Sequence, residues 1–116
     1  MRPDPADTLF RVLADPTRRR ILDLLVERGP LNVTELAGQF RDLVASGISK
    51  HLMGLRAAGL VHASREGRQQ IYSVDARAVS GALTPWLEKY DRYWMAALER
   101  LRDLAEEDEE DVEEDE

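Results

Sequence analysis

The sequence has no cysteine among its 116 residues, which excludes disulfide bonds, thiolate metal ligands and cysteine nucleophiles. It also has no apolar run near the roughly 18 residues that a membrane-spanning helix needs. The first ten residues, MRPDPADTLF, lack the basic start and apolar core of a secretory signal. These absences predict a cytoplasmic protein that does not bind a membrane.

Sequence motifs for catalysis and for metal binding are missing as well. The chain has no glycine-rich phosphate loop, no nucleophile elbow and no spaced pair of carboxylates beside a partner base. Only two histidines, His51 and His62, could serve as imidazole ligands, and no set of carboxylate ligands accompanies them. The sequence therefore predicts a protein that is not an enzyme and that needs neither a metal nor another cofactor.

Charge is distributed unevenly along the chain, whose formal net charge is -7. Residues 106–116, EEDEEDVEEDE, hold ten of the 23 acidic residues and no basic ones, so the other 105 residues carry 16 Lys and Arg against 13 Asp and Glu, a net charge of +3. A block of like charges repels itself and cannot bury a core. We expect residues 106–116 to be a disordered acidic tail and residues 1–105 to form one compact, mildly basic domain.

Four helices are predicted in the first half of the chain, at about residues 5–13, 16–28, 32–40 and 44–58. Asp15 is a good N-cap for the second helix, and Pro16 suits its first position, where the missing N–H costs nothing. Gly29 ends that helix. Asn32 and Glu35 are three residues apart, which is the spacing of a capping box at the start of the third helix.

The fourth helix, residues 44–58, has two distinct faces. Its inward face carries the apolar residues Ile48, Leu52 and Leu55. Its outer face carries Ser46, Ser49, Lys50 and Met53, three or four residues apart. Two β-prone runs follow, LVHAS and QQIYSV, and the connecting REGR with Gly67 predicts a β-hairpin.

The pattern returns to helix after Asp75. Thr84 and Pro85 are suited to the N-cap and first position of a last helical segment. From there apolar residues recur at intervals of three and four: Leu87, Tyr90, Trp94, Ala97, Leu101 and Leu104. Such a seam favours the pairing of two helices. The order of elements predicts a mostly α-helical protein with a small β-hairpin wing, that is, a winged helix-turn-helix with a long C-terminal dimerisation helix.

Four stretches carry a resemblance to a known family. VLADPTRRRILDLL, ELAGQF, ISKHLMGLRAAGLV and REGRQQIYSV, in this order and spacing, resemble the ArsR/SmtB family of small dimeric bacterial repressors over about residues 9–74. The later segment WLEKYDRYW resembles the branch of that family without a metal site. The resemblance implies a homodimer that represses transcription by binding a short inverted repeat in double-stranded DNA. It does not identify an inducer.

The resemblance also implies which residues bind DNA, with the fourth helix in the major groove and the hairpin on the flanking backbone. The positions that match the DNA-binding positions of the family hold Ser46, Ser49, Lys50, His51, Arg65, Arg68 and Gln70. Hydroxyl and imidazole groups suit base edges, whereas Lys and Arg neutralise phosphates without carrying sequence information. We add Arg18, or its neighbour Arg19, as a phosphate contact, because this basic run starts a helix, and the start of a helix also favours anions. The dimer is predicted to pack Leu9 of the first helix with the seam of the last.

A second interpretation belongs to another class of protein. The chain could be a protein-interaction module whose acidic tail imitates nucleic acid. Such a mimic would not need Ser49, Lys50, Arg65 and Arg68 on one face, so the sequence favours the DNA-binding regulator.

Overall fold

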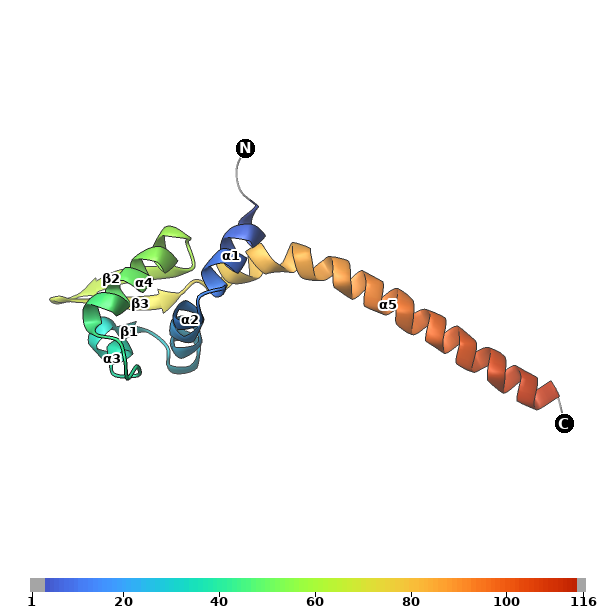
Figure 1. Ribbon diagram of the computed structural model, residues 1–116. Helices are drawn as coiled ribbons and strands as arrows, with labels where there is room; N and C mark the ends of the chain where they lie inside the picture. The colour runs from blue at the N-terminus through green and yellow to red at the C-terminus, as the bar shows by residue number, and fades with distance from the viewer. Residues whose placement is uncertain (1–3, 115–116) are drawn as a thin grey trace. The chain divides into compact units, whose positions relative to one another are not determined.

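The computed structural model describes the backbone of residues 4–114 and the side chains of residues 4–109. The chain forms two compact units, residues 1–83 and residues 84–116. Figure 1 labels the helices and strands in chain order. The elements that begin in the first unit are α1 (Pro5–Leu13), α2 (Pro16–Arg28), β1 (Leu31–Asn32), α3 (Val33–Ala37), α4 (Ala45–Ala57), β2 (Val61–Glu66), β3 (Gln69–Val74) and α5 (Ala76–Glu114).

The predicted starts of α2 and α3 are confirmed by side chains that cap them. The Asp15 carboxylate accepts hydrogen bonds from the backbone N–H groups of Thr17 and Arg18 at 2.8 and 3.2 Å. Asn32 and Glu35 form a complete capping box, in which each side chain accepts from the other residue's N–H at 2.7 and 3.0 Å. These caps satisfy N–H groups that have no partner within the helix, so the boundaries follow from local sequence.

The core of the first unit lies among the helices and the base of the sheet. The inward face predicted for α4 is confirmed, because Ile48, Leu52 and Leu55 are each 0% exposed. In α2 the spacing of the apolar residues predicts an inward stripe of Ile21, Leu22, Leu25 and Val26, but Val26 is 68% exposed, whereas Leu24 is fully buried. Leu9 of α1 is also a core residue, only 1% exposed, so its side chain is not available for the dimer contact predicted for it.

The sheet has three strands, in the order β1-β3-β2, and all its pairs are antiparallel. The pairing of Glu66 with Gln69 leaves a two-residue turn, and Gly67 within it has a φ of +62°, a conformation that glycine adopts without strain. The hairpin is therefore confirmed, with β3 over the predicted run and β2 continuing two residues further, to Glu66. The third strand, β1, was not predicted, because two residues are too few to show a periodic pattern.

The return to helix predicted after Asp75 is confirmed, but a new helix start at Thr84 is not. Helix α5 begins at Ala76, whose preceding residue Asp75 accepts a hydrogen bond from the Ala78 N–H at 2.9 Å, and Thr84 lies inside the helix and is not an N-cap. Pro85 lies inside the helix and removes one backbone hydrogen bond, but the turns on both sides keep their helical pattern. The boundary between the compact units falls at the same place in the chain, between Leu83 and Thr84.

The second unit is the remainder of α5. Its predicted seam is largely exposed, with Tyr90 at 55% and Leu101 at 62%, and the Trp86 and Tyr90 rings lie 4.7 Å apart between centroids. Residues 106–114 are helical, where the sequence predicts a disordered tail. Glutamate is a good helix former, and the Arg102 Nε lies 3.5 Å from the Glu106 carboxylate one turn away, which favours helix at this point. Residues 115–116 of the predicted tail lie outside the described residues.

Candidate nucleic-acid interface

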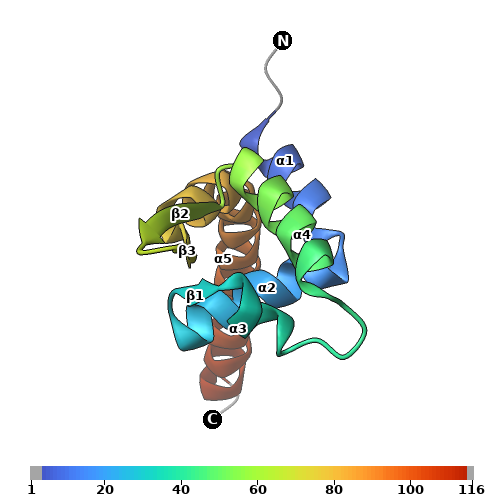
Figure 2. The same ribbon diagram turned by 90° about the vertical axis from the view of Figure 1, so that its left-hand side faces the viewer.

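Helices α3 and α4 pack against each other and form the helix-turn-helix. In Figure 2, α4 runs across the side that faces the viewer, with α3 below it and the β2–β3 hairpin beside it. Because Ile48, Leu52 and Leu55 are buried on one side of α4, the opposite side is fixed toward the outside. An extended ligand such as a DNA duplex could contact both α4 and the hairpin from this side.

The outer side of α4 carries the residues predicted to face DNA. Ser46 and Lys50 are exposed and Ser49 is half-buried. Met53 continues the same face and is 70% exposed, although methionine side chains are usually buried in folded proteins. Val44 is the N-cap residue of α4 and makes no side-chain capping bond. The face thus combines hydroxyl, ammonium and thioether groups that could meet base edges and backbone.

His51 lies at the edge of this face and contacts α2. The Arg18 Nε donates a hydrogen bond to the His51 Nδ1 at 3.4 Å, and both residues are half-buried. Burial raises the pKa of Asp15, but hydrogen bonds from the Arg18 and Thr17 N–H groups and the positive charge of Arg18 outweigh this and leave that pKa below its ordinary value. The structure thus brings together two predicted DNA contacts, Arg18 and His51, which the sequence treats separately.

The wing displays the three other predicted contacts. Arg65 on β2 pairs with Gln70 on β3, so their side chains lie on the same face of the hairpin. Arg68 is in the turn, and all three side chains are exposed. The Gln70 Oε1 also accepts a hydrogen bond from the Tyr72 hydroxyl at 3.2 Å. At the base of the wing, the Asn32 Nδ2 donates to the Gln69 Oε1 at 3.2 Å, which ties the hairpin to the start of α3.

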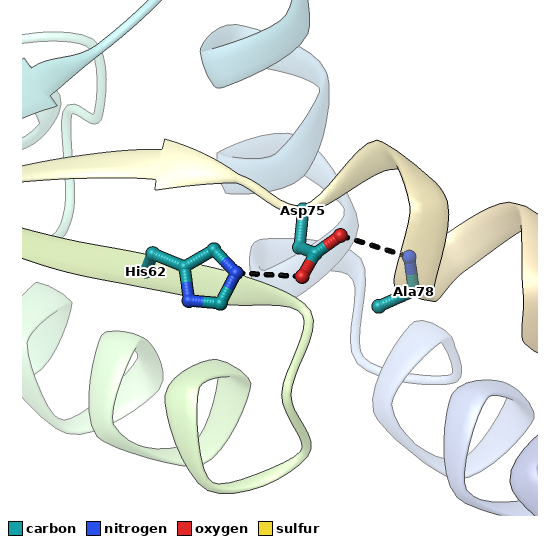
Figure 3. A network of polar contacts seen from close by, with 3 residues as sticks. All are labelled: His62, Asp75 and Ala78. Carbon is teal, nitrogen blue, oxygen red and sulfur yellow. Dashed lines mark hydrogen bonds and ion pairs between the residues drawn. The ribbon is translucent and has the colours of Figure 1, made fainter.

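A contact that the sequence does not reveal joins the wing to α5. Figure 3 shows His62 of β2 pointing toward Asp75, which also caps α5 through Ala78. The His62 Nε2 lies 2.6 Å from the Asp75 Oδ2. The hydrogen bond from the Ala78 N–H, followed by that from His62, lowers the pKa of Asp75 from its ordinary value of 3.8. The sequence does not relate His62 to Asp75, because no local pattern connects positions 13 residues apart.

The lowered pKa of Asp75 predicts a pH dependence of stability. The folded protein favours the charged carboxylate, so this stabilisation is present above the ordinary pKa and is lost as the pH falls through the lowered value. We expect Asp75→Asn to have a lower melting temperature than the wild type at neutral pH, and the difference to shrink below about pH 4. Thermal unfolding across a pH series measures this, with Asp23→Asn on the exposed side of α2 as the control. A difference that is constant down to pH 2 would contradict the assignment.

Two further observations concern the described part of the chain. No group of three or more His, Asp or Glu side chains among residues 4–109 could together hold a metal ion. No helix within the described residues is both long and apolar enough to cross a lipid bilayer.

Comparison with known proteins identifies the fold and the family. The model of a family described as "Helix-turn-helix domain" matches residues 13–62. The HTH-type transcriptional regulator Rv2034 of Mycobacterium tuberculosis is 38% identical over 94 residues, which cover 79% of this chain and 80% of that protein. The crystal structure of the ArsR family transcriptional regulator RHA00566 superposes with a TM-score of 0.68 and 32% identity, covering 82% of this chain and 95% of that one.

A solution structure from Mycobacterium bovis is also similar. It is the homodimeric winged helix-turn-helix DNA-binding domain of Mb0332, a possible ArsR-family regulator, with a TM-score of 0.60, 28% identity, and coverage of 78% of this chain and 82% of that one. These matches support a transcriptional regulator and not the protein-interaction module considered as the alternative. With its α3–α4 pair and its β2–β3 wing on one side of the first unit, this chain belongs to the ArsR family of winged helix-turn-helix transcriptional regulators.

Proposed function

We propose that this regulator is a homodimeric repressor that binds a short inverted repeat in double-stranded DNA. The observation that carries this proposal is the orientation of α4, whose buried residues Ile48, Leu52 and Leu55 fix Ser46 and Lys50 on the outside. An α-helix with such a polar outer side fits the major groove of B-DNA. The basic wing lies on the same side of the unit and is suited to the flanking phosphates.

The contacts divide by chemistry. Ser46, Ser49 and His51 carry groups that can donate to or accept from base edges. Lys50, Arg65 and Arg68 carry permanent positive charges that neutralise phosphates, and Gln70 lies beside Arg65 on the wing. This division assigns sequence discrimination to α4 and general affinity mainly to the charged residues.

The dimer is supported by the second unit and by a relative. The seam of α5 exposes Leu87, Tyr90 and Leu101 at 41–62% in the single chain, which is unfavourable for apolar side chains in water. The similar Mb0332 domain is a homodimer. A two-fold dimer covers this seam with its own copy and presents two α4 helices, so the DNA site is an inverted repeat. Binding to such a site near a promoter would exclude the transcription machinery.

In vitro selection of random duplexes with the purified full-length protein tests this function. We expect enrichment of an inverted repeat whose half-sites are centred about 34–36 Å apart, one turn of DNA. Enrichment of a single unrepeated half-site would contradict the dimer, and the absence of any enriched sequence would contradict sequence-specific binding.

We also propose that the acidic residues 106–116 compete with DNA for the basic residues of the first unit. Ten negative charges are joined to the rest of the chain, whose net charge is +3, so they attract the same basic residues that DNA phosphates would contact. Removing residues 106–116 should tighten binding to random duplexes by roughly two- to tenfold at low salt, and less at physiological salt, where the Debye length is about 8 Å.

The matched control for this prediction keeps the length of the tail and removes its charge, with Gln and Asn in place of its Glu and Asp. Both variants should bind random DNA more tightly than the full-length protein, with little change in melting temperature. Titrations of operator and random duplexes over a salt series provide the comparison. Curves that coincide for all three proteins at every salt concentration would show that the tail does not compete.

A further inference from the structure

We propose that Arg18 is a positioning residue, which holds the His51 ring so that it offers a single N–H donor to a base edge, and thereby contributes to the sequence specificity of α4. Arg18 then acts through His51 and is not itself a phosphate contact. The inference rests on the proposed function, in which His51 of α4 contacts bases.

The hydrogen bond between the two side chains determines which ring nitrogen carries the proton. The Arg18 Nε–H donates to the His51 Nδ1 at 3.4 Å. A guanidinium can only donate, so the Nδ1 must accept and carries no proton. In the neutral imidazole the proton then resides on the Nε2, the other ring nitrogen. His51 held in this way is a donor at the Nε2 and is not an acceptor there.

Gly54, one turn after His51 on α4, provides the space for this contact. A Cβ atom built at Gly54 would lie 2.8 Å from the Arg18 Nη2 and 3.0 Å from its Cζ. The φ of Gly54 is not positive, so the backbone does not require glycine at this position. Glycine in the middle of a helix is unfavourable relative to alanine. The close approach of the Arg18 guanidinium gives a physical reason for glycine here.

The other end of Arg18 is held in place by the start of α2. Its backbone N–H donates to the Asp15 carboxylate at 3.2 Å, within the N-cap of that helix. The Asp15 carboxylate also interacts electrostatically with the Arg18 side chain. Arg18 is half-buried, whereas the neighbouring Arg19 and Arg20 are exposed. The side chain is therefore directed along the junction of α2 and α4, where those two helices contact each other.

A fixed N–H donor selects among bases in the major groove. It can pair with the N7 or O6 of guanine, the N7 of adenine or the O4 of thymine, but not with the amino group of cytosine. If Arg18 is removed, neither the ring orientation nor the proton position of His51 is fixed by α2. Discrimination at the base pair that His51 contacts should then decrease, while charge contacts elsewhere in the interface stay the same.

Binding measurements with a double-mutant cycle test this role. The operator obtained by selection is compared with a version substituted at the base pair where His51→Ala loses discrimination. We expect Arg18→Ala to reduce discrimination at the same base pair by roughly tenfold, and the double variant to lose no more than either single variant. Arg20→Ala, which removes an exposed charge from the same helix, is the matched control and should leave this discrimination unchanged.

Two further variants separate positioning from charge. Arg18→Lys keeps the charge but loses the Nε–H, so it should resemble Arg18→Ala. Gly54→Ala should displace the guanidinium and lower discrimination, although alanine is the better helix former and should not lower the melting temperature. In the Arg18→Ala background, Gly54→Ala should have no further effect on discrimination. Loss of specificity without loss of stability is not expected from a residue that only supports the fold.

The proton position can be observed in the protein without DNA. The chain has only two histidines, so ¹⁵N NMR of the imidazole rings resolves His51 with the help of the His51→Ala variant. We expect a protonated Nε2 and an unprotonated Nδ1 in the wild type, and a measurable fraction of the other tautomer in Arg18→Ala.

The outcomes distinguish this inference from the proposed function. One outcome would show that Arg18 is a phosphate contact and that the inference is wrong. In it, Arg18→Ala weakens binding to the operator and to the substituted operator equally, and its effect is additive with that of His51→Ala. The slope of the logarithm of the binding constant against the logarithm of the salt concentration would also become shallower by about 1. If His51→Ala itself changes no discrimination, the base contact assigned to His51 is wrong, and the inference fails with it. If His51→Ala loses discrimination and Arg18→Ala does not, only the inference fails.

Discussion

Leu101→Glu should convert the dimer into monomers and weaken operator binding by about a hundredfold or more, because joining two half-site contacts in one molecule raises affinity by about 10²–10⁴. Leu101 is 62% exposed on α5 in the single chain, so a charged side chain is tolerated there by the monomer. In a dimer that covers the seam, the same carboxylate would be desolvated beside apolar neighbours. Glutamate is a good helix former, so α5 itself should persist.

Sedimentation velocity and operator titration together measure this effect. The matched control is Arg92→Gln, which changes the net charge by the same amount and lies nine residues away, on the opposite side of the helix. It should remain a dimer with operator affinity close to that of the wild type. A Leu101→Glu protein that sediments as a dimer and binds the operator normally would show that another surface forms the dimer.

Lys50→Ala and His51→Ala should weaken binding in different ways, although the two residues are adjacent on α4. Lys50 is exposed and carries a full charge, so its loss should weaken operator and random duplexes by similar factors and make the log–log salt slope shallower by about 1. His51→Ala should leave the slope nearly unchanged and reduce the ratio of specific to non-specific affinity by roughly tenfold, as expected for one base contact.

Titrations of operator, substituted operator and random duplex at several salt concentrations separate the two effects. Ser64→Ala, an exposed substitution on β2 that leaves all charges in place, is a suitable control for both variants. Equal losses of specificity in Lys50→Ala and His51→Ala would contradict the division between phosphate and base contacts. A shallower salt slope for His51→Ala would assign its side chain to the backbone of the DNA.

Helix boundaries and the hairpin were predictable because their causes lie within a few residues of each other. Asp15 and Asn32 cap helices through N–H groups two or three positions ahead, and Gly67 supplies the turn conformation that the hairpin requires. The additional helix start expected at Thr84 was wrong for a related reason. Thr84 and Pro85 form a good local start signal, but Asp75 already caps the helix, and a single proline does not end it.

Burial was predictable only in part, because the spacing of apolar residues shows which face of a helix is apolar but not which element packs against that face. The inward face of α4 was correct in every residue, since its three apolar positions have polar neighbours on the other side. Leu9 was assigned to a dimer contact on the same type of pattern, but the packing of α1 against α2 places it in the core of the first unit. The sequence pattern is the same whether the apolar face meets its own chain or a second copy.

Neighbouring residues and motifs in a fixed order were enough to predict the order of elements, the caps of α2 and α3, the outer face of α4 and the family. The contacts of Arg18 with His51 and of His62 with Asp75 arise only in the folded chain. These partners are 33 and 13 residues apart, and each pair joins two elements whose approach is set by the core between them. No local spacing records such a distance, so the connections of α2 to α4 and of the wing to α5 follow from packing alone.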